Sequence, residues 1–129
     1  MSDECIAVYT CEGPGRILRQ GGSRAWNLGK TANRARKCNY LICIQYQKNK
    51  HPDCSEASEP HKAVFMVGKI SDVIPDSIES DRWKICISEY ALHTVMNAWP
   101  GNRKPHWYPT LEKIGIDPGV LEFKPISEK

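Results

Sequence analysis

The hydrophobic positions along the chain fall mainly into short runs that are typical of β-strands. Residues 6–10 form a β-branched and aromatic run that stops at a Gly-Pro-Gly turn, and residues 40–46 form a nearly continuous apolar run. A continuous apolar run indicates a strand that is covered on both faces. We therefore expect a short strand at residues 6–10 and a central strand at residues 40–46.

The longest strand signal covers residues 63–74, whose first half is continuously apolar. Gly68 lies inside this run and predicts a bulge or bend, because a glycine in a strand often marks such an irregularity. A further strand is expected at residues 82–87, where every second residue is apolar.

Helical signals are few and short. Thr31 or Asn33 can cap a turn over residues 35–37, and Ser88 can cap a helix over residues 89–96, where apolar residues recur at roughly helical spacing.

The C-terminal part adds one more helical signal, a single turn at residues 110–115 that a glycine closes. Residues 47–61 and 97–109 are expected to be loops. Strands separated by small helices predict an α+β fold, built on a mixed, strongly curved sheet or a partly open β-barrel.

The composition fits one globular domain over residues 1–129. Hydrophobic residues make up 40% and charged residues 26%, which excludes disordered, collagen-like and coiled-coil classes. No apolar run approaches the roughly 20 residues that a membrane span needs. The acidic N-terminus also lacks the basic and apolar regions of a signal peptide. These features predict a cytoplasmic protein with no membrane partner.

Six cysteines are expected to be reduced thiols, because the cytoplasm keeps thiols reduced. Cys43 and Cys86 lie in apolar runs and are expected to be buried, since free cysteine packs as a small hydrophobe. No Cys-x-x-Cys pair is present, so His51, Cys54 and His61 are the best metal candidates. The sequence predicts no bound metal and no cofactor.

Basic residues are concentrated in the first part of the chain. Residues 1–50 hold nine Lys or Arg and three acids, and no acid lies between Glu12 and Asp53. A stretch of one sign this long indicates an anionic partner. The alternative is that acids from the second half of the chain pack against it.

The first candidate site is the segment 20–28. Its two glycines let a ligand approach the backbone, its tryptophan offers a ring for a flipped or single-stranded base, and its arginine offers a cation for a phosphate. The alternative is that the tryptophan anchors this segment in the core. The candidate binding residues here are Ser23, Arg24, Trp26 and Asn27.

The second candidate site is the segment 99–110, which holds three aromatic residues, two bases and three prolines. Prolines limit the entropy that a loop loses on binding, and an arginine can reach a phosphate or a base edge. The alternative is a loop that closes one end of a barrel. We expect it to meet the first segment in one pocket. The candidates here are Trp99, Arg103, Trp107 and Tyr108.

Catalytic signatures are poor. The chain has no Gly-x-Ser-x-Gly elbow, no Walker loop, no dinucleotide fingerprint and no His-Glu-x-x-His motif. His93 and His106 have no obvious carboxylate or nucleophile partner close in sequence. A small enzyme that acts on an anionic metabolite or nucleotide is therefore an alternative in which one of these histidines, facing Arg24 or Arg103, is the acid or base.

Residues 22–28, 40–44, 61–73 and 108–116 resemble a group of small uncharacterised microbial proteins. The glycine-containing strand within residues 61–73 is also similar to one in the EVE and ASCH domains of the PUA-like superfamily. That resemblance implies a small β-barrel that binds RNA or modified DNA bases. We expect a nucleic-acid or modified-nucleotide binding module, the other alternative being an interaction domain without a ligand of its own.

Overall fold

The computed structural model of the protein describes residues 4–29, 32–46, 57–78, 81–99, 101 and 106–126. The strands in these residues are Cys5–Thr10 (β1), Gly22–Trp26 (β2), Tyr40–Gln45 (β3), Val64–Pro75 (β4), Trp83–Val95 (β5), His106–Trp107 (β6) and Lys124–Pro125 (β7). The helices are Pro14–Gln20 (α1), Ala32–Arg36 (α2), Leu111–Ile114 (α3) and the 3₁₀-helix Pro118–Val120 (η3).

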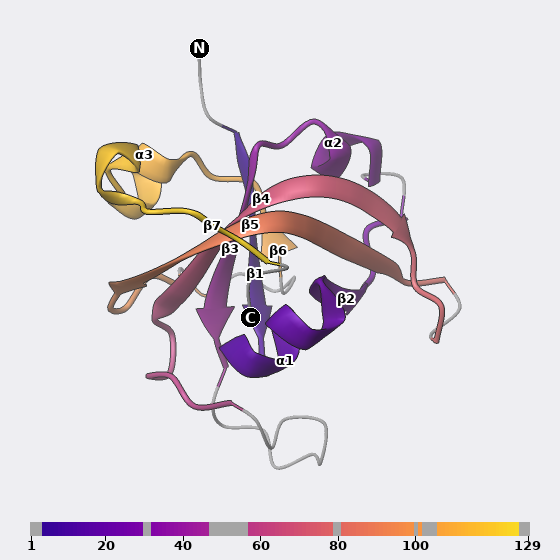
Figure 1. The fold of residues 1–129 in the computed structure, drawn as a ribbon, viewed down its shortest axis with the longest axis horizontal. Helices are drawn as coiled ribbons and strands as arrows, with labels where there is room; N and C mark the ends of the chain where they lie inside the picture. The colour runs from indigo at the N-terminus through magenta and orange to yellow at the C-terminus, as the bar shows by residue number, and fades with distance from the viewer. Residues whose placement is uncertain are drawn as a thin grey trace.

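The strands form one sheet in the order β2-β5-β4-β3-β1-β6, and β7 pairs with β5. Strands β1 and β3 are parallel, whereas β3, β4 and β5 pair antiparallel with one another in turn. Figure 1 shows the long strands β4 and β5 as a strongly curved pair, and the sheet is an open half-barrel. The predicted mixed, strongly curved sheet with short helices is thereby confirmed.

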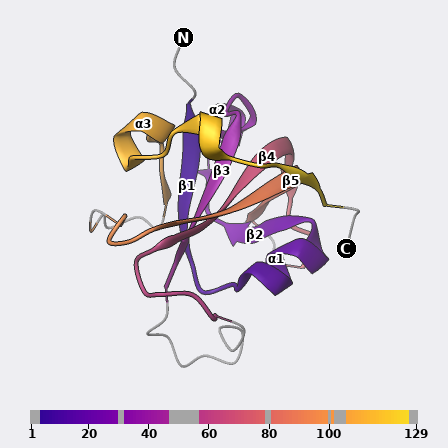
Figure 2. The ribbon, with the colours of Figure 1, turned by 60° about the vertical axis from the view of Figure 1, so that its left-hand side comes forward.

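Both faces of the sheet carry packed side chains. Along β1, Ile6 and Val8 belong to one hydrophobic cluster while Cys5 and Ala7 belong to another, as the two-residue period of a strand requires. We call the cluster that contains Ile6 and Val8 the inner cluster, and the one that contains Cys5 and Ala7 the outer cluster. The inner cluster also contains buried residues of α1, β2 and α2, and the outer cluster contains residues of α3 and the C-terminal segment. Figure 2 shows α1 and α3 far apart, with the strands between them.

The prediction of a helix at residues 89–96 is wrong, because β5 continues as a strand to Val95. It pairs with β4 over its whole length, from Val64 opposite Val95 to Pro75 opposite Trp83. Along this stretch Ala91 is buried and the next residue is exposed, which is a strand alternation. A ladder this long outweighs the weak local preference of eight residues for a helix.

Helix α1 and strand β2 were not predicted from the sequence. Pro14 is the first residue of α1, where a missing backbone N–H costs nothing, and Gly21 ends the helix in the left-handed conformation at φ 78°. The two short helical turns that were predicted are present as α2 and α3. In α3, the Thr110 side chain accepts a hydrogen bond from the Lys113 N–H at 3.1 Å.

Gly68 lies directly before the irregular part of β4, as predicted. The pairing of β4 with β5 shifts register between Lys69 and Ile70 and again between Ile70 and Asp72. A Cβ atom at Gly68 would come within 2.6 Å of the Ile87 side chain on β5. The glycine therefore allows the two strands to approach closely inside the curl.

Replacing Gly22 with alanine is expected to lower the free energy of unfolding by about 1–3 kcal/mol, as overpacking usually does. The new Cβ would collide with the Ile85 carbonyl oxygen and lie within 2.8 Å of the Cys86 Cα, and paired backbone cannot rotate away. Urea denaturation measures the change. Gly15→Ala is the control, because this exposed helical position has room for a methyl group. Equal midpoints for the Gly22 variant and the unchanged protein would contradict this account.

Four of the cysteines are free thiols: Cys5, Cys38 and Cys43 are buried and Cys86 is partly buried. Cys11 is disulfide-bonded. The prediction that every cysteine is reduced is therefore wrong, since it rested on the expected compartment and the compartment does not fix the state of each thiol. No helix among the described residues is long and apolar enough to cross a membrane.

Candidate nucleic-acid interface

Strand β2 buries two predicted site residues, Ser23 and Trp26, of which Trp26 belongs to the inner cluster. Residues three apart in a regular strand point to opposite faces. Here the pairing with β5 shifts register between Ser23 and Trp26, and Ala25 has a φ of 70°. The bulge brings both side chains inward, and the Trp26 indole N–H donates to the Ser23 hydroxyl at 2.8 Å.

The carboxylate of Glu12, just after β1, binds strand β2. Glu12 is only 7% exposed. It accepts hydrogen bonds from the Ser23 hydroxyl, from the Thr10 hydroxyl at 3.0 Å and from the Gln20 amide at 2.8 Å. The backbone N–H of Arg24 lies 3.5 Å from the same carboxylate. These donors replace the water that a buried carboxylate loses.

Sequence reasoning missed Glu12 as an organising residue. The available signal was its isolation, since it is the one acid between Glu4 and Asp53. Its role depends on contacts with α1 and β2, two elements that were not predicted.

Arg24 forms a paired contact with Asp76, with nitrogen–oxygen distances of 3.2 and 2.9 Å. The Asp76 side chain is 1% exposed and that of Arg24 is 14% exposed. The pair joins β2 to the end of β4 across 52 positions of sequence. The polar groups of Ser23, Arg24 and Trp26 are thus bound within the protein, while Asn27 is exposed.

The second predicted segment is divided between the two faces of the sheet. Trp99 stacks on Tyr9 in the outer cluster, with ring centroids 4.4 Å apart, and Trp107 meets Trp99 edge-on at 6.5 Å. Tyr108 packs instead against the inner cluster, which also holds Trp26. Among the described residues, the two predicted segments therefore share the inner cluster through Trp26 and Tyr108. Arg103 lies outside the described residues.

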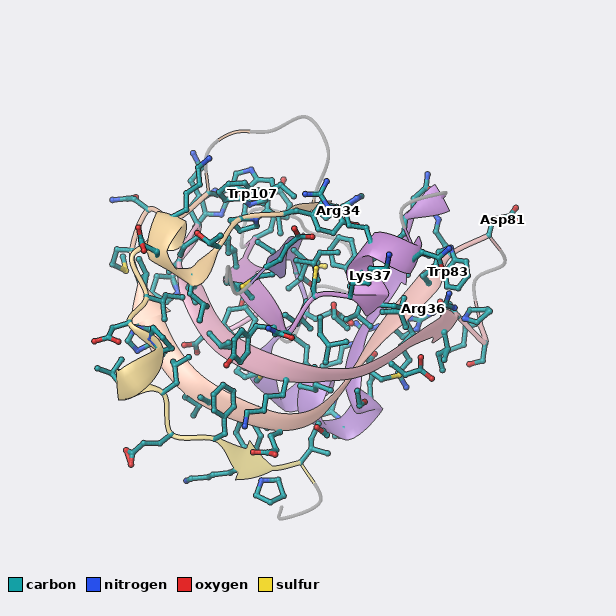
Figure 3. The ribbon with its side chains drawn as sticks, turned by 90° about the horizontal axis from the view of Figure 1, so that it is seen from above. Arg34, Arg36, Lys37, Asp81, Trp83 and Trp107 are labelled. Atoms are coloured by element: carbon teal, nitrogen blue, oxygen red, sulfur yellow. The ribbon has the colours of Figure 1, made fainter. Side chains whose placement is uncertain are left out.

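Helix α2 presents an exposed basic face. Ala32 and Ala35 are buried against the sheet, while Arg34, Arg36 and the following Lys37 are exposed. Two small residues on the buried side let this helix lie close to β4. Figure 3 shows the three cationic side chains gathered around α2, with Trp83 on the side of Arg36 and Trp107 beyond Arg34.

Each arginine of α2 lies over a half-buried aromatic ring. The Arg34 guanidinium is 4.2 Å from the centroid of Tyr108, and that of Arg36 is 5.4 Å from the centroid of Trp83. A guanidinium held over a ring has already lost part of its rotational freedom. We call the following five residues the α2 surface: Arg34, Arg36, Lys37, Trp83 and Tyr108.

Further contacts fix the arginines of the α2 surface. Arg36 donates to the Val73 carbonyl oxygen at 3.1 Å and to the Asn33 side chain at 2.8 Å. Arg34 pairs with Glu4 at 3.1 Å, and both side chains are about half exposed, at 54% and 41%. Such an exposed ion pair contributes about 0–1 kcal/mol, so a phosphate can compete with Glu4 for Arg34.

His93 lies in a hollow of about 580 Å³ between α1 and β5, beside Glu59 and the rings of Phe65 and Tyr90. The enzyme alternative requires a histidine that faces Arg24 or Arg103. Arg24 is not among the described residues that line this hollow.

The predicted metal candidates fall largely outside the described residues, since His51 and Cys54 lie there. His61 is described, and its Nε2 lies 3.1 Å from the Tyr9 hydroxyl. In the described ranges, no group of three or more His, Cys, Asp or Glu could hold a metal ion.

Comparison of the chain with protein-family models, with curated proteins and with solved structures found no match. The resemblance to PUA-like domains therefore stays a prediction.

Proposed function

We propose that the protein binds single-stranded nucleic acid through the α2 surface. The observation that carries this proposal is that two exposed guanidinium groups on one short helix each lie over an aromatic ring. Cations bind the phosphates of a strand, and aromatic rings and guanidinium planes stack with its bases.

The charge around the α2 surface supports an anionic partner. The basic stretch could serve an anionic partner, or acids from the second half of the chain could pack against it. The second alternative holds for Arg24, whose charge Asp76 neutralises. On α2 the only ion pair among the described residues is the exposed one between Arg34 and Glu4. Arg36 and Lys37 therefore contribute their positive charge to the surface, where it attracts phosphate groups.

The aromatic partners favour a single strand over a duplex. In a duplex the base faces are covered by neighbouring bases, whereas an unpaired base can stack on a ring or on a guanidinium plane. Trp83 lies on β5 and Tyr108 follows β6, so rings of two separate elements hold the two arginines, whose guanidinium planes a base can stack on. One strand that crosses α2 can contact both.

Replacing Arg34, Arg36 and Lys37 together with glutamine is expected to weaken binding of a 12-nucleotide RNA or DNA strand at least ten-fold. Fluorescence anisotropy at several salt concentrations measures this effect. For single strands, the slope of log K against log salt changes by about 0.7 per phosphate contact. Losing three contacts should therefore reduce the magnitude of the slope by about 2.

A matched control removes the same charge elsewhere on the molecule. Lys62, Lys113 and Lys124 are exposed and lie outside the α2 surface. Changing these three to glutamine should leave most of the affinity in place. An equal loss in both triple variants would show a response to net charge alone and overturn the proposed surface. No binding of any RNA or DNA at low salt would end the proposal.

A further inference from the structure

A groove of about 470 Å³ connects the α2 surface with the middle of the long strands. Its wall contains Arg36 and Lys37 of the α2 surface together with Lys69 of β4 and Ser88 of β5. This volume falls within the range of ligand sites. Because these residues line one hollow, an extended ligand that lies on the α2 surface can continue along the groove to Lys69.

The wall of this groove is basic. It holds the three cations Arg36, Lys37 and Lys69, and none of the described residues that line it is an aspartate or glutamate. The Cys38 thiol in the wall adds no negative charge, because burial raises its pKa to about 12. The hollow between α1 and β5, by contrast, contains Glu59. The charge of the groove beside α2 therefore favours an anion.

The Lys69 ammonium is held over an aromatic ring, as the two arginines of α2 are. It lies 4.6 Å from the centroid of the Phe123 ring, and that ring stacks with Tyr40 at a centroid distance of 5.8 Å. Tyr40 is also the cross-strand neighbour of Lys69 on β3. An ammonium that is already restrained in this way loses less side-chain freedom when it binds an anion.

Lys69 also has an acidic partner, which lies directly opposite it on β5. This partner is Glu89, and 3.6 Å separates its carboxylate from the ammonium. The two side chains are 42% and 38% exposed. Such an exposed pair is weak, because water screens both charges. A phosphate can therefore replace Glu89 beside Lys69, and Glu89 acts as its competitor.

We propose that a nucleic-acid strand bound to the α2 surface continues through this groove and places a further backbone phosphate on Lys69. The inference rests on the proposed function and adds a binding site on the sheet to the one on α2. Lys37 belongs both to the α2 surface and to the groove wall, so the strand passes from one to the other at this residue. At the far end, the phosphate takes the place of the Glu89 carboxylate. The site reads the backbone of the strand and not its base sequence.

Two substitutions at the far end of the groove should change binding of a 12-nucleotide strand in opposite directions. Lys69→Gln removes the cation, so it is expected to weaken binding roughly three-fold or more at low salt and to reduce the magnitude of the salt slope by about 0.7. Glu89→Gln removes the competitor, so it is expected to strengthen binding by about two- to five-fold. Fluorescence anisotropy with the full chain at several salt concentrations measures both effects.

Matched controls make the same two changes of charge on α3. Glu112 and Lys113 are exposed, and neither lines the groove. Glu112→Gln and Lys113→Gln should leave the affinity nearly unchanged, and circular dichroism checks that all four variants are folded. If the α3 variants shift the affinity as much as the groove variants do, the response is to net charge alone and the inference is wrong.

The outcomes separate this inference from the proposed function. If the triple glutamine variant of the α2 surface loses binding while Lys69→Gln and Glu89→Gln change nothing, the strand does not enter the groove and the proposed function stands. If Lys69→Gln weakens only inorganic phosphate, followed by NMR shifts, and not the strand, the groove is a separate anion site and the inference is again wrong. If the unchanged protein binds no strand at low salt, the proposed function itself fails.

Discussion

Glu12→Ala is expected to lower the free energy of unfolding by about 3–5 kcal/mol, the cost of leaving several donors of a buried network without their acceptor. The side chains of Thr10, Gln20 and Ser23 all donate to this carboxylate, which is 7% exposed. Each buried donor that loses its acceptor costs about 1–3 kcal/mol, and the shorter side chain also leaves a cavity. Urea denaturation followed by circular dichroism measures the loss.

The glutamine variant tests whether the charge or the shape of Glu12 matters. Glu12→Gln keeps the volume but presents an N–H₂ group to one set of donors, where the carboxylate presents an oxygen. Its cost should be smaller than that of the alanine variant, although still measurable. Unchanged stability in Glu12→Ala would show that the network does not hold α1 and β2 to the end of β1.

The sequence could predict those parts of the fold in which local pattern and tertiary packing agree. The apolar runs in β3 and in the first half of β4 form strands that are buried on both faces. A continuous apolar run is the sequence pattern of such a strand. Helix α3 was predictable for a similar reason, since Thr110 and Gly115 cap it locally. In each case the local residue pattern and the tertiary packing specify the same element.

The missed elements depend on contacts between distant residues. Strand β2 has five residues, two of them at positive φ, and it exists because β5 pairs with it and Glu12 accepts a hydrogen bond from its Ser23 hydroxyl. The second half of β5 is a strand because β4 lies beside it along its full length. Neither partner is visible from the local spacing of apolar residues.

For the candidate site, the sequence indicated useful residue types but not their partners. It singled out Arg24, yet Asp76 holds that guanidinium from 52 positions away. The arginines of α2 were counted only as part of a basic stretch, because Tyr108 and Trp83 lie far from them in the chain. The proposed interface became visible only when the fold placed those rings against the guanidinium groups.

Trp26→Ala is expected to cost about 3–5 kcal/mol of stability, as large-to-small changes of buried aromatic residues do. Trp26 is 7% exposed, lies in the inner cluster and donates its indole hydrogen to Ser23. Because the alanine variant is too unstable for a clean binding test, Trp26→Leu is the informative partner. Leucine keeps an apolar side chain in the core but has no ring on which a base can stack.

The same pair of variants decides where an unpaired base stacks. If Trp26 is only a core anchor, Trp26→Leu should bind a 12-nucleotide strand as tightly as the unchanged protein, even though its unfolding midpoint is lower. A folded Trp26→Leu protein that loses about 1–3 kcal/mol of binding, the cost of one stacked base, would place the base at Trp26. We expect that loss instead for Trp83→Ala, because this half-buried ring belongs to the α2 surface.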